Sequence, residues 1–265
     1  MIAMKTNSAA RTSPAAAAPS ITLAQRVRAL HESAQRSDHV FASPLGPFRE
    51  EGVEYYVPRF VYFGPHTSQE SLRIAVLSGL SRHDGIIVNA LLSFVEQLAR
   101  QSDIGQSLNV SIFPIANVVG LLGNAEERDL AETHWARSSQ PEIALLSQDA
   151  RRCGYQGFIR VTTTTDDQPA ARVTTVRSLT SHISELEIFS SDDFRPWPVR
   201  FETVSVSQAR TGPLTIADDL AYAPFEIELA LPTDWPQPLV DRMLAGFLKR
   251  LLIRYRGFLA YGQHL

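Results

Sequence analysis

The sequence has few of the features that would place a protein in a special class. Cys153 is its one cysteine among 265 residues, so no disulfide can form within the chain, and we expect a reducing compartment, the cytoplasm. Neither charge dominates, because 25 lysines and arginines face 28 aspartates and glutamates, for a formal net charge of -3. Such a balance attracts neither nucleic acid nor an anionic membrane, so we expect neither as a partner.

Long apolar runs are missing as well. No stretch approaches the ~18 uncharged apolar residues of a membrane-spanning helix. Residues 1–20 are rich in alanine, serine, threonine and proline, contain no acidic residue, and lack the apolar centre of a secretory signal. We therefore expect a disordered tail over 1–20 and one domain over 21–265. The whole chain has 44% hydrophobic and 20% charged residues, which is typical of a soluble globular protein.

Apolar periodicity predicts strands and helices in alternation through the first part of the domain. The expected order is a helix near 23–30, extended chain over 53–64, a strand at 73–80, a helix at 86–100, a strand from 108, a helix from 141 and a strand at 157–163. Strands that alternate with helices along the chain favour a largely parallel sheet with helices on both faces.

The later part of the sequence is rich in strands. Alternating apolar residues predict strands at 183–189, 199–207 and 225–231. A closing helix over about 238–259 has one apolar stripe, formed by Val240, Met243, Leu244, Phe247, Leu248, Leu251 and Leu252. We expect this stripe to pack on the sheet, rather than on a membrane surface, and the basic residues of the helix to face solvent.

Several short motifs follow one another in a recognisable order. An apolar strand ends in the turn "LSGLSRHDG" before a helix, and the next strand ends in "PIANVVGLL", which contains Pro114, Asn117 and Gly120. The stretches "DLAE", "SQPEIALL", "IRVTTTT" and "FEIEL" come later in the chain. In this order the motifs resemble those of the zinc carboxypeptidase superfamily, including its succinylglutamate desuccinylase and aspartoacylase branch, over about residues 70–260.

The resemblance implies a three-layer α/β/α fold with a mixed, largely parallel, twisted sheet. It also implies a site at the carboxyl ends of the strands, where ligands usually bind in open α/β sheets. In this family a Phe-x-x-Glu-Leu strand carries the catalytic carboxylate. The similar "FEIEL" places Glu228 at the general-base position.

The zinc ligands of the family are replaced in this sequence. The resemblance places the first histidine position on Ser81, the glutamate position on Asp84 and the second histidine position on Thr162. A catalytic zinc takes neutral imidazole and carboxylate ligands, whereas an alcohol that stays protonated at neutral pH is a poor donor. We therefore expect no metal cofactor, and Glu228 would be idle without one.

The positions that help to hold a substrate carboxylate in the family have changed too. The Asn-Arg pair of its Asp-Leu-Asn-Arg signature becomes Ala131 and Glu132, which reverses the charge. Arg160 occupies the position of an acid that would orient a zinc ligand, and we expect it to pair with Asp84 or Glu228. The expected ligand site comprises Arg82, His83, Asp84, Asn117, Glu132 and Arg160.

These changes favour a pseudoenzyme, a binding or regulatory module for a small molecule or peptide. The alternative is an active zinc-dependent amide hydrolase, of the carboxypeptidase or deacylase type, with other ligands such as His83, Asp84 and His134. A further alternative is metal-free catalysis by Ser81 with His83 as its base. The last is an inert site and a protein that acts through "RPWPVRF" and "LPTDWPQP", which we expect instead to be rigid turns with packed tryptophans. The oligomeric state stays open.

Overall fold

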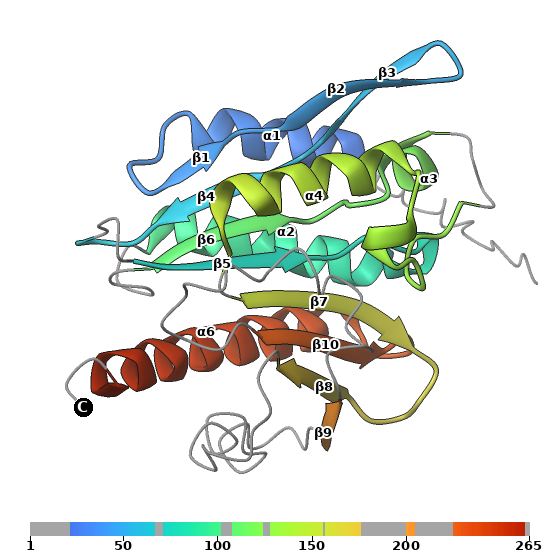
Figure 1. The fold of residues 1–265 in the computed structure, drawn as a ribbon. Helices are drawn as coiled ribbons and strands as arrows, with labels where there is room; N and C mark the ends of the chain where they lie inside the picture. Colours follow the sequence, from blue (N-terminus) through green and yellow to red (C-terminus); the bar gives the residue numbers. More distant parts are fainter. Residues whose placement is uncertain are drawn as a thin grey trace, which may run out of the picture.

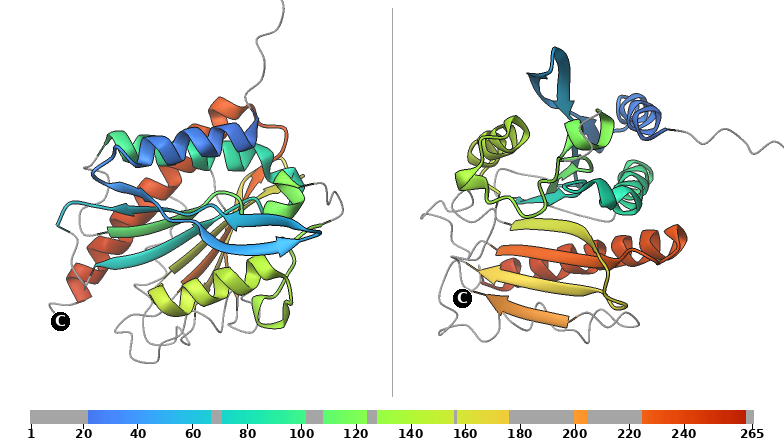
Figure 2. Two further views of the ribbon diagram at one scale, coloured as in Figure 1. Left: turned by 90° about the horizontal axis from the view of Figure 1, so that it is seen from above. Right: turned by 90° about the vertical axis from the view of Figure 1, so that its right-hand side faces the viewer.

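The computed structural model describes residues 22–66, 71–101, 108–123, 128–155, 157–175, 200–204 and 225–262. Eight of its strands form one sheet in the order β1-β4-β6-β5-β7-β10-β8-β9 (Figure 1). These strands are β1 (Val40–Ala42), β4 (Phe60–Phe63), β5 (Leu72–Leu77), β6 (Leu108–Phe113), β7 (Gly157–Thr164), β8 (Ala170–Thr175), β9 (Arg200–Val204) and β10 (Phe225–Pro232). The strands β2 (Leu45–Glu50) and β3 (Val53–Val57) pair separately and form a hairpin that projects from the body (Figure 2).

The large sheet is mixed, with a parallel centre. Strand β5 is parallel to both β6 and β7, β7 is parallel to β10, and β8 is parallel to β9, whereas the other three pairs are antiparallel. Helices α1 (Leu23–Ala34), α2 (Gly85–Arg100) and α6 (Gln237–Gly262) cover one face, and α4 (Pro141–Cys153) covers the other (Figure 2). The expected three-layer α/β/α fold is therefore confirmed.

The helices begin and end where local chemistry favours it. Helix α1 starts at a capping box in which Thr22 and Gln25 bind each other's backbone N–H groups. Helix α4 has Pro141 in its first turn and is followed by Gly154 in the left-handed conformation. All seven residues of the stripe predicted on the closing helix are buried, as expected. Among the described residues, no helix has both the length and the apolarity that a membrane crossing needs.

The strand after residue 71 ends earlier than the sequence predicts. We expected it to extend to residue 80, but β5 stops at Leu77 because Gly79 turns the chain with φ of +61°. A Cβ at Gly79 would lie 2.8 Å from the carbonyl oxygen of Pro114, so a side chain is excluded there by both conformation and space. This close approach joins the turn after β5 to the end of β6.

Some sequence predictions lie partly or wholly outside the described residues. They concern the tail over 1–20, the strand at 183–189, most of "RPWPVRF" and both ends of the strand at 199–207, of which the structure describes β9. Of the second tryptophan loop, the structure shows Trp235 partly buried and packed against the core, which agrees with a rigid turn.

Candidate binding site at the carboxyl ends of the strands

The turn after β5 is a capping box. Ser81 precedes the short helix η1 (Arg82–Asp84), which leads into α2. Its hydroxyl accepts hydrogen bonds from the backbone N–H groups of His83 and Asp84, and the carboxylate of Asp84 accepts one from the N–H of Ser81 in return. The Ser81 hydroxyl also donates to Oδ2 of Asp129 at 2.8 Å. Both hydrogen-bonding capacities of Ser81 are therefore used within the protein.

Asp84 is fully buried and joins this turn to β7. Its Oδ2 accepts from the N–H groups of Leu80 at 3.1 Å and Ser81 at 3.0 Å. Its Oδ1 accepts from the N–H of Thr163 at 3.0 Å and from the hydroxyl of Thr163 at 3.1 Å. Burial raises the pKa of Asp84 above its ordinary value, and the hydrogen bonds from Ser81, Thr163 and Leu80 oppose this rise. Both carboxylate oxygens thus face protein donors.

Asn117 connects three segments at the end of β6. Its side chain is fully buried, and Nδ2 donates to the carbonyl oxygens of Leu80 at 3.1 Å and Arg128 at 2.7 Å. Its Oδ1 accepts from the N–H of Gly120 and so caps α3 (Val118–Leu122). Every polar atom of this amide is committed to holding the backbone in place.

Residues 128–131 form a strap across the carboxyl ends of the strands. The N–H of Leu130 donates to the carbonyl of Leu80 at 2.9 Å, and the side chain of Leu130 is buried. Arg128 anchors the start of the strap through ion pairs with Glu50 on β2, at 2.9 Å, and with the buried Glu142 on α4. The strap thereby ties the hairpin, α4 and the turn after β5 together.

Arg160 lies at the centre of a row of charges on the α4 side of the sheet. It is 1% exposed, and its Nη1 lies 2.5 Å from Oε1 of Glu228 and 3.6 Å from Oε1 of Glu226. Its Nη2 donates to the carbonyl of Ala131 in the strap at 2.6 Å. The other oxygen of Glu228 lies 3.3 Å from Nη1 of Arg172. The strand register produces this row, because Glu228 lies directly between Arg160 on β7 and Arg172 on β8.

No protein-family model matches the sequence, and neither does any curated protein. Solved structures match in fold. The metallo-carboxypeptidase from Burkholderia cenocepacia superposes with a TM-score of 0.62 at 13% identity, over 89% of this chain and 69% of the other. The metallo-carboxypeptidase from Pseudomonas aeruginosa, in complex with (2-guanidinoethylmercapto)succinic acid, superposes with a TM-score of 0.63 at 16% identity, over 87% of this chain and 68% of the other. Carboxypeptidase A from Helicoverpa armigera superposes with a TM-score of 0.63 at 12% identity, over 89% of this chain and 72% of the other. The chain has the zinc carboxypeptidase fold.

Within this carboxypeptidase-like fold, the three positions that the resemblance assigns to zinc ligands have other tasks. Ser81 and Asp84 form the capping box, and Thr162, which is half-buried, pairs with Ala230 across the sheet. A zinc ion would meet two alcohols and a carboxylate whose oxygens already accept four hydrogen bonds. The residues at these positions therefore do not fit zinc.

The ligand residues of the alternative hydrolase do not gather either. His83 and His134 are exposed while Asp84 is buried, and no group of three or more histidines, cysteines or acids in the described part of the chain could hold a metal. The metal-free alternative also lacks its geometry. His83 contacts the Ser81 hydroxyl through its backbone N–H, whereas its imidazole Nε2 accepts a 3.4 Å contact from Nε of Arg82.

The expected ligand residues divide into two groups. Asp84, Asn117 and Arg160 are buried and bound to neighbouring segments. Arg82, His83 and Glu132 are exposed. Of the two partners expected for Arg160, the structure selects Glu228.

Four residues of this network were not predicted as part of the site: Asp129, Thr163, Arg172 and Glu226. One signal in the sequence could have indicated how the turn after β5 is built. The spacing Ser-x-x-Asp before an apolar run is a capping-box pattern, and it predicts that Ser81 and Asp84 bind backbone rather than a ligand. The roles of Arg172 and Glu226 depend on strand register and have no local signal.

Proposed function

We propose that this carboxypeptidase-like chain is a pseudoenzyme that acts as a binding or regulatory module. The observation that carries the proposal is the commitment of Asp84, whose two carboxylate oxygens accept four hydrogen bonds from the protein. A carboxylate that coordinates a metal ion keeps an oxygen free for the metal. Asp84 instead stabilises the turn after β5 and fixes it to β7.

The surroundings of Glu228 support the same proposal. A general base in hydrolysis must face the water molecule whose proton it removes. Glu228 faces guanidinium groups on both sides, Arg160 at 2.5 Å and Arg172 at 3.3 Å. Amide hydrolysis also needs an activated nucleophile and stabilisation of the oxyanion, which account for many orders of magnitude in rate. Ser81, Asp84 and Thr162 supply neither.

We propose that the ligand of the module is a small molecule or a peptide that binds beside the charge row. Arg172 is 48% and Glu228 24% exposed at the side chain, so this end of the row is reachable from solvent while Arg160 is not. An accessible guanidinium can bind a carboxylate or phosphate in bidentate fashion. We expect an anionic group on the ligand, and we expect neither nucleic acid nor a membrane as a partner.

Elemental analysis tests the proposal. The protein is purified without chelators or a metal-affinity tag, and its zinc content is measured before and after dialysis against zinc. We expect far less than one zinc per chain and no hydrolysis of C-terminal peptide or N-acyl amino acid substrates. About one zinc per chain, with turnover that a chelator abolishes, would refute the pseudoenzyme. The His83→Ala variant is the matched control, because loss of metal in it would identify the alternative ligand set.

Binding is tested separately. A panel of small carboxylates and phosphates is screened by thermal shift against the wild type and the Arg172→Met variant. A stabilising ligand that loses its effect in Arg172→Met supports a site beside the charge row. If every ligand found acts equally on both proteins, the ligand does not bind there.

A further inference from the structure

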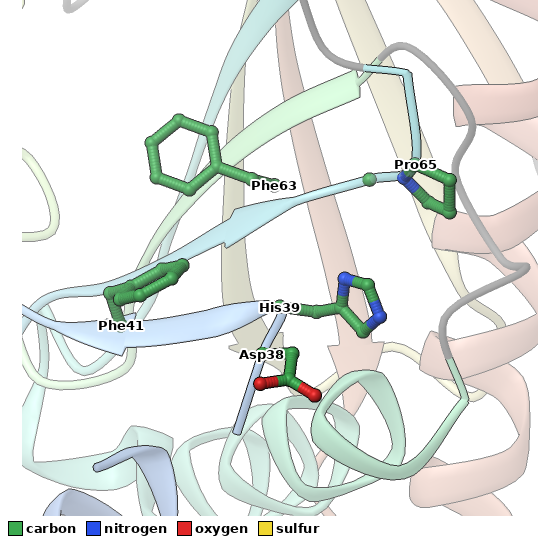
Figure 3. A pocket seen from close by; sticks show the side chains of 6 residues that line it. Asp38, His39, Phe41, Phe63 and Pro65 are labelled. Carbon is green, nitrogen blue, oxygen red and sulfur yellow. The ribbon is translucent and has the colours of Figure 1, made fainter. Parts of the chain in front are cut away.

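A hollow lies at the opposite end of the sheet from the charge row. Its volume is about 560 Å³, and it is lined by Asp38, His39, Phe41, Phe63, Gly64 and Pro65 (Figure 3). Strand β4 runs antiparallel to β6, so the end of β4 lies beside the beginning of β6, where the N–H of Gly64 donates to the carbonyl of Leu108. The candidate site lies where β5, β6 and β7 end, so the two sites are at opposite edges of the sheet.

Strand periodicity explains why aromatic rings line this hollow. Val40 and Tyr62 are directly paired, so their strand neighbours Phe41 and Phe63 both point to the other face of the sheet. His39 and Pro65 lie just beyond the ends of β1 and β4. The opposite face, with Val40, Phe60 and Tyr62, is buried under α1 and α2, where the His31 ring contacts Phe60. The hollow therefore lies on the face of β1 and β4 that α1 and α2 do not cover.

The two phenylalanines form an accessible apolar wall. Phe41 is 46% and Phe63 37% exposed, and their rings contact edge to face with centroids 5.7 Å apart. Each of the two rings could bury well over 100 Å² against a ligand. The exposed ring faces carry the negative side of the aromatic quadrupole, which attracts a cation within about 6 Å of the ring centroid.

The charge at the rim of the hollow also favours a cation. Asp38 is exposed and is the one acidic residue of the lining, which contains no lysine or arginine. Among the residues that the structure describes, its carboxylate has no ion-pair partner. Figure 3 shows Asp38 and His39 on one side of the hollow and the two phenylalanine rings on the other.

We infer that this hollow binds a small organic cation with an aromatic or branched apolar body. The apolar body lies against Phe41, Phe63 and Pro65, and the ammonium group lies over a ring face, with the carboxylate of Asp38 at the rim of the hollow. A volume of about 560 Å³ is within the ~300–1,000 Å³ of small-molecule sites. The hollow is open on one side, so we expect a weak affinity, of about millimolar Kd. This site is independent of the proposed function.

The test uses three probes of equal size and different charge: 2-phenylethylammonium, 2-phenylethanol and 3-phenylpropionate. Backbone amide shifts of the full chain are followed by NMR during titration with each probe. We expect the cation to bind most tightly and to move the amide signals of residues 38–41 and 63–65. We expect the alcohol to bind a few-fold more weakly, and the carboxylate about tenfold more weakly, because Asp38 and the ring faces repel it.

Two variants separate the contributions. Asp38→Asn keeps the size and exposure of the side chain, and it should weaken the binding of the cation about threefold while leaving the binding of the alcohol unchanged. Phe41→Ala should weaken both by about tenfold, because it removes the apolar wall. Both positions are exposed, so we expect both variants to fold. The inference is overturned if the three probes bind equally, if the shifts appear elsewhere, or if neither substitution changes the affinity of the cation.

Discussion

Replacement of Asp84 by asparagine tests the central structural argument. Asparagine has the same size but offers one acceptor oxygen in place of two, and its amide donates on the other side. The least costly orientation keeps the oxygen toward the N–H groups of Leu80 and Ser81 and turns the NH₂ toward Thr163. The hydroxyl of Thr163 can then rotate to accept, but the N–H of Thr163 meets a donor and loses its partner.

The magnitude follows from these contacts. A buried N–H without a partner costs about 1–3 kcal/mol, and each of the two bonds that change from a charged to a neutral acceptor weakens by about 1 kcal/mol. Relief from burying a charge offsets part of this loss, because Asp84 is fully buried. We expect Asp84→Asn to lower the free energy of unfolding by about 2–4 kcal/mol, which is less than the total stability of a typical domain.

The assay is urea unfolding followed by tryptophan fluorescence and circular dichroism. A loss of about 3 kcal/mol shifts the midpoint down by roughly 1 M for a domain of this size. Asp167→Asn, at an exposed position after β7, is the matched control and should change the free energy of unfolding by less than about 0.5 kcal/mol. An equally small effect of Asp84→Asn would refute the reasoning, because the carboxylate would then be free of its protein donors and available to a ligand.

Three further predictions concern charge and pH. The pKa of Asp84 is raised in the folded state, so the native chain binds this proton more tightly than the unfolded chain does. The stability of the wild type relative to Asp84→Asn should therefore rise as pH falls through the folded pKa, and level off below 3.8. Urea midpoints at several pH values check this, and the reverse trend would contradict it. Arg160→Met should lower the free energy of unfolding by about 3–5 kcal/mol, because Glu226 and Glu228 lose their buried cation. Arg172→Met, at a half-exposed position, should lower it by less than about 1 kcal/mol. Similar unfolding free energies for the two variants would contradict this prediction. Burial, and then the charge of Asp149, raise the pKa of Tyr155 in the folded state. The wild type should therefore lose stability as pH rises above 10.0, and Tyr155→Phe should remove that loss. An alkaline unfolding curve that is unchanged in Tyr155→Phe would show that another group titrates.

Much of the fold could be predicted from the sequence because its signals are periodic and local. The stripe that includes Val240 and Leu251 repeats at helical spacing, and its burial under the sheet follows from hydrophobicity alone. The order of strands and helices likewise predicts the parallel centre. The early end of β5 was missed because it depends on a contact between Gly79 and Pro114, two segments that are far apart in the sequence.

The candidate site was predictable in place but not in detail. Its residues lie in turns at the carboxyl ends of parallel strands, which is a rule of open α/β sheets. Which side chains meet is decided by one-residue differences: Thr163, and not its neighbour Thr162, reaches Asp84, because adjacent residues on a strand point to opposite faces. The pairing of Glu228 with Arg172 depends on the register of β8 against β10, which no short stretch encodes.

The charge row has a consequence for how β10 finds its register. Glu226 and Glu228 are two residues apart, so a slip of β10 by two residues would place one acid where the other had been, between Arg160 and Arg172. Such a slip also leaves every apolar residue of β10 on its original face, because strand side chains repeat with period two. Neither charge nor hydrophobic alternation therefore distinguishes the native pairing from the slipped one.

The distinction comes from anchors at the edge of the sheet that carries the candidate site. Just beyond β10, the N–H of Thr233 donates to the carbonyl of Thr164 at 2.9 Å, and Gln237 at the start of α6 donates to the carbonyl of Ile86. The partner strand β7 is held at Thr163 by Asp84. The bonds of Asp84, at a position that the resemblance assigns to a zinc ligand, therefore also select one alignment of two strands. Weakening these bonds would favour mispaired chains during folding as well as a looser turn.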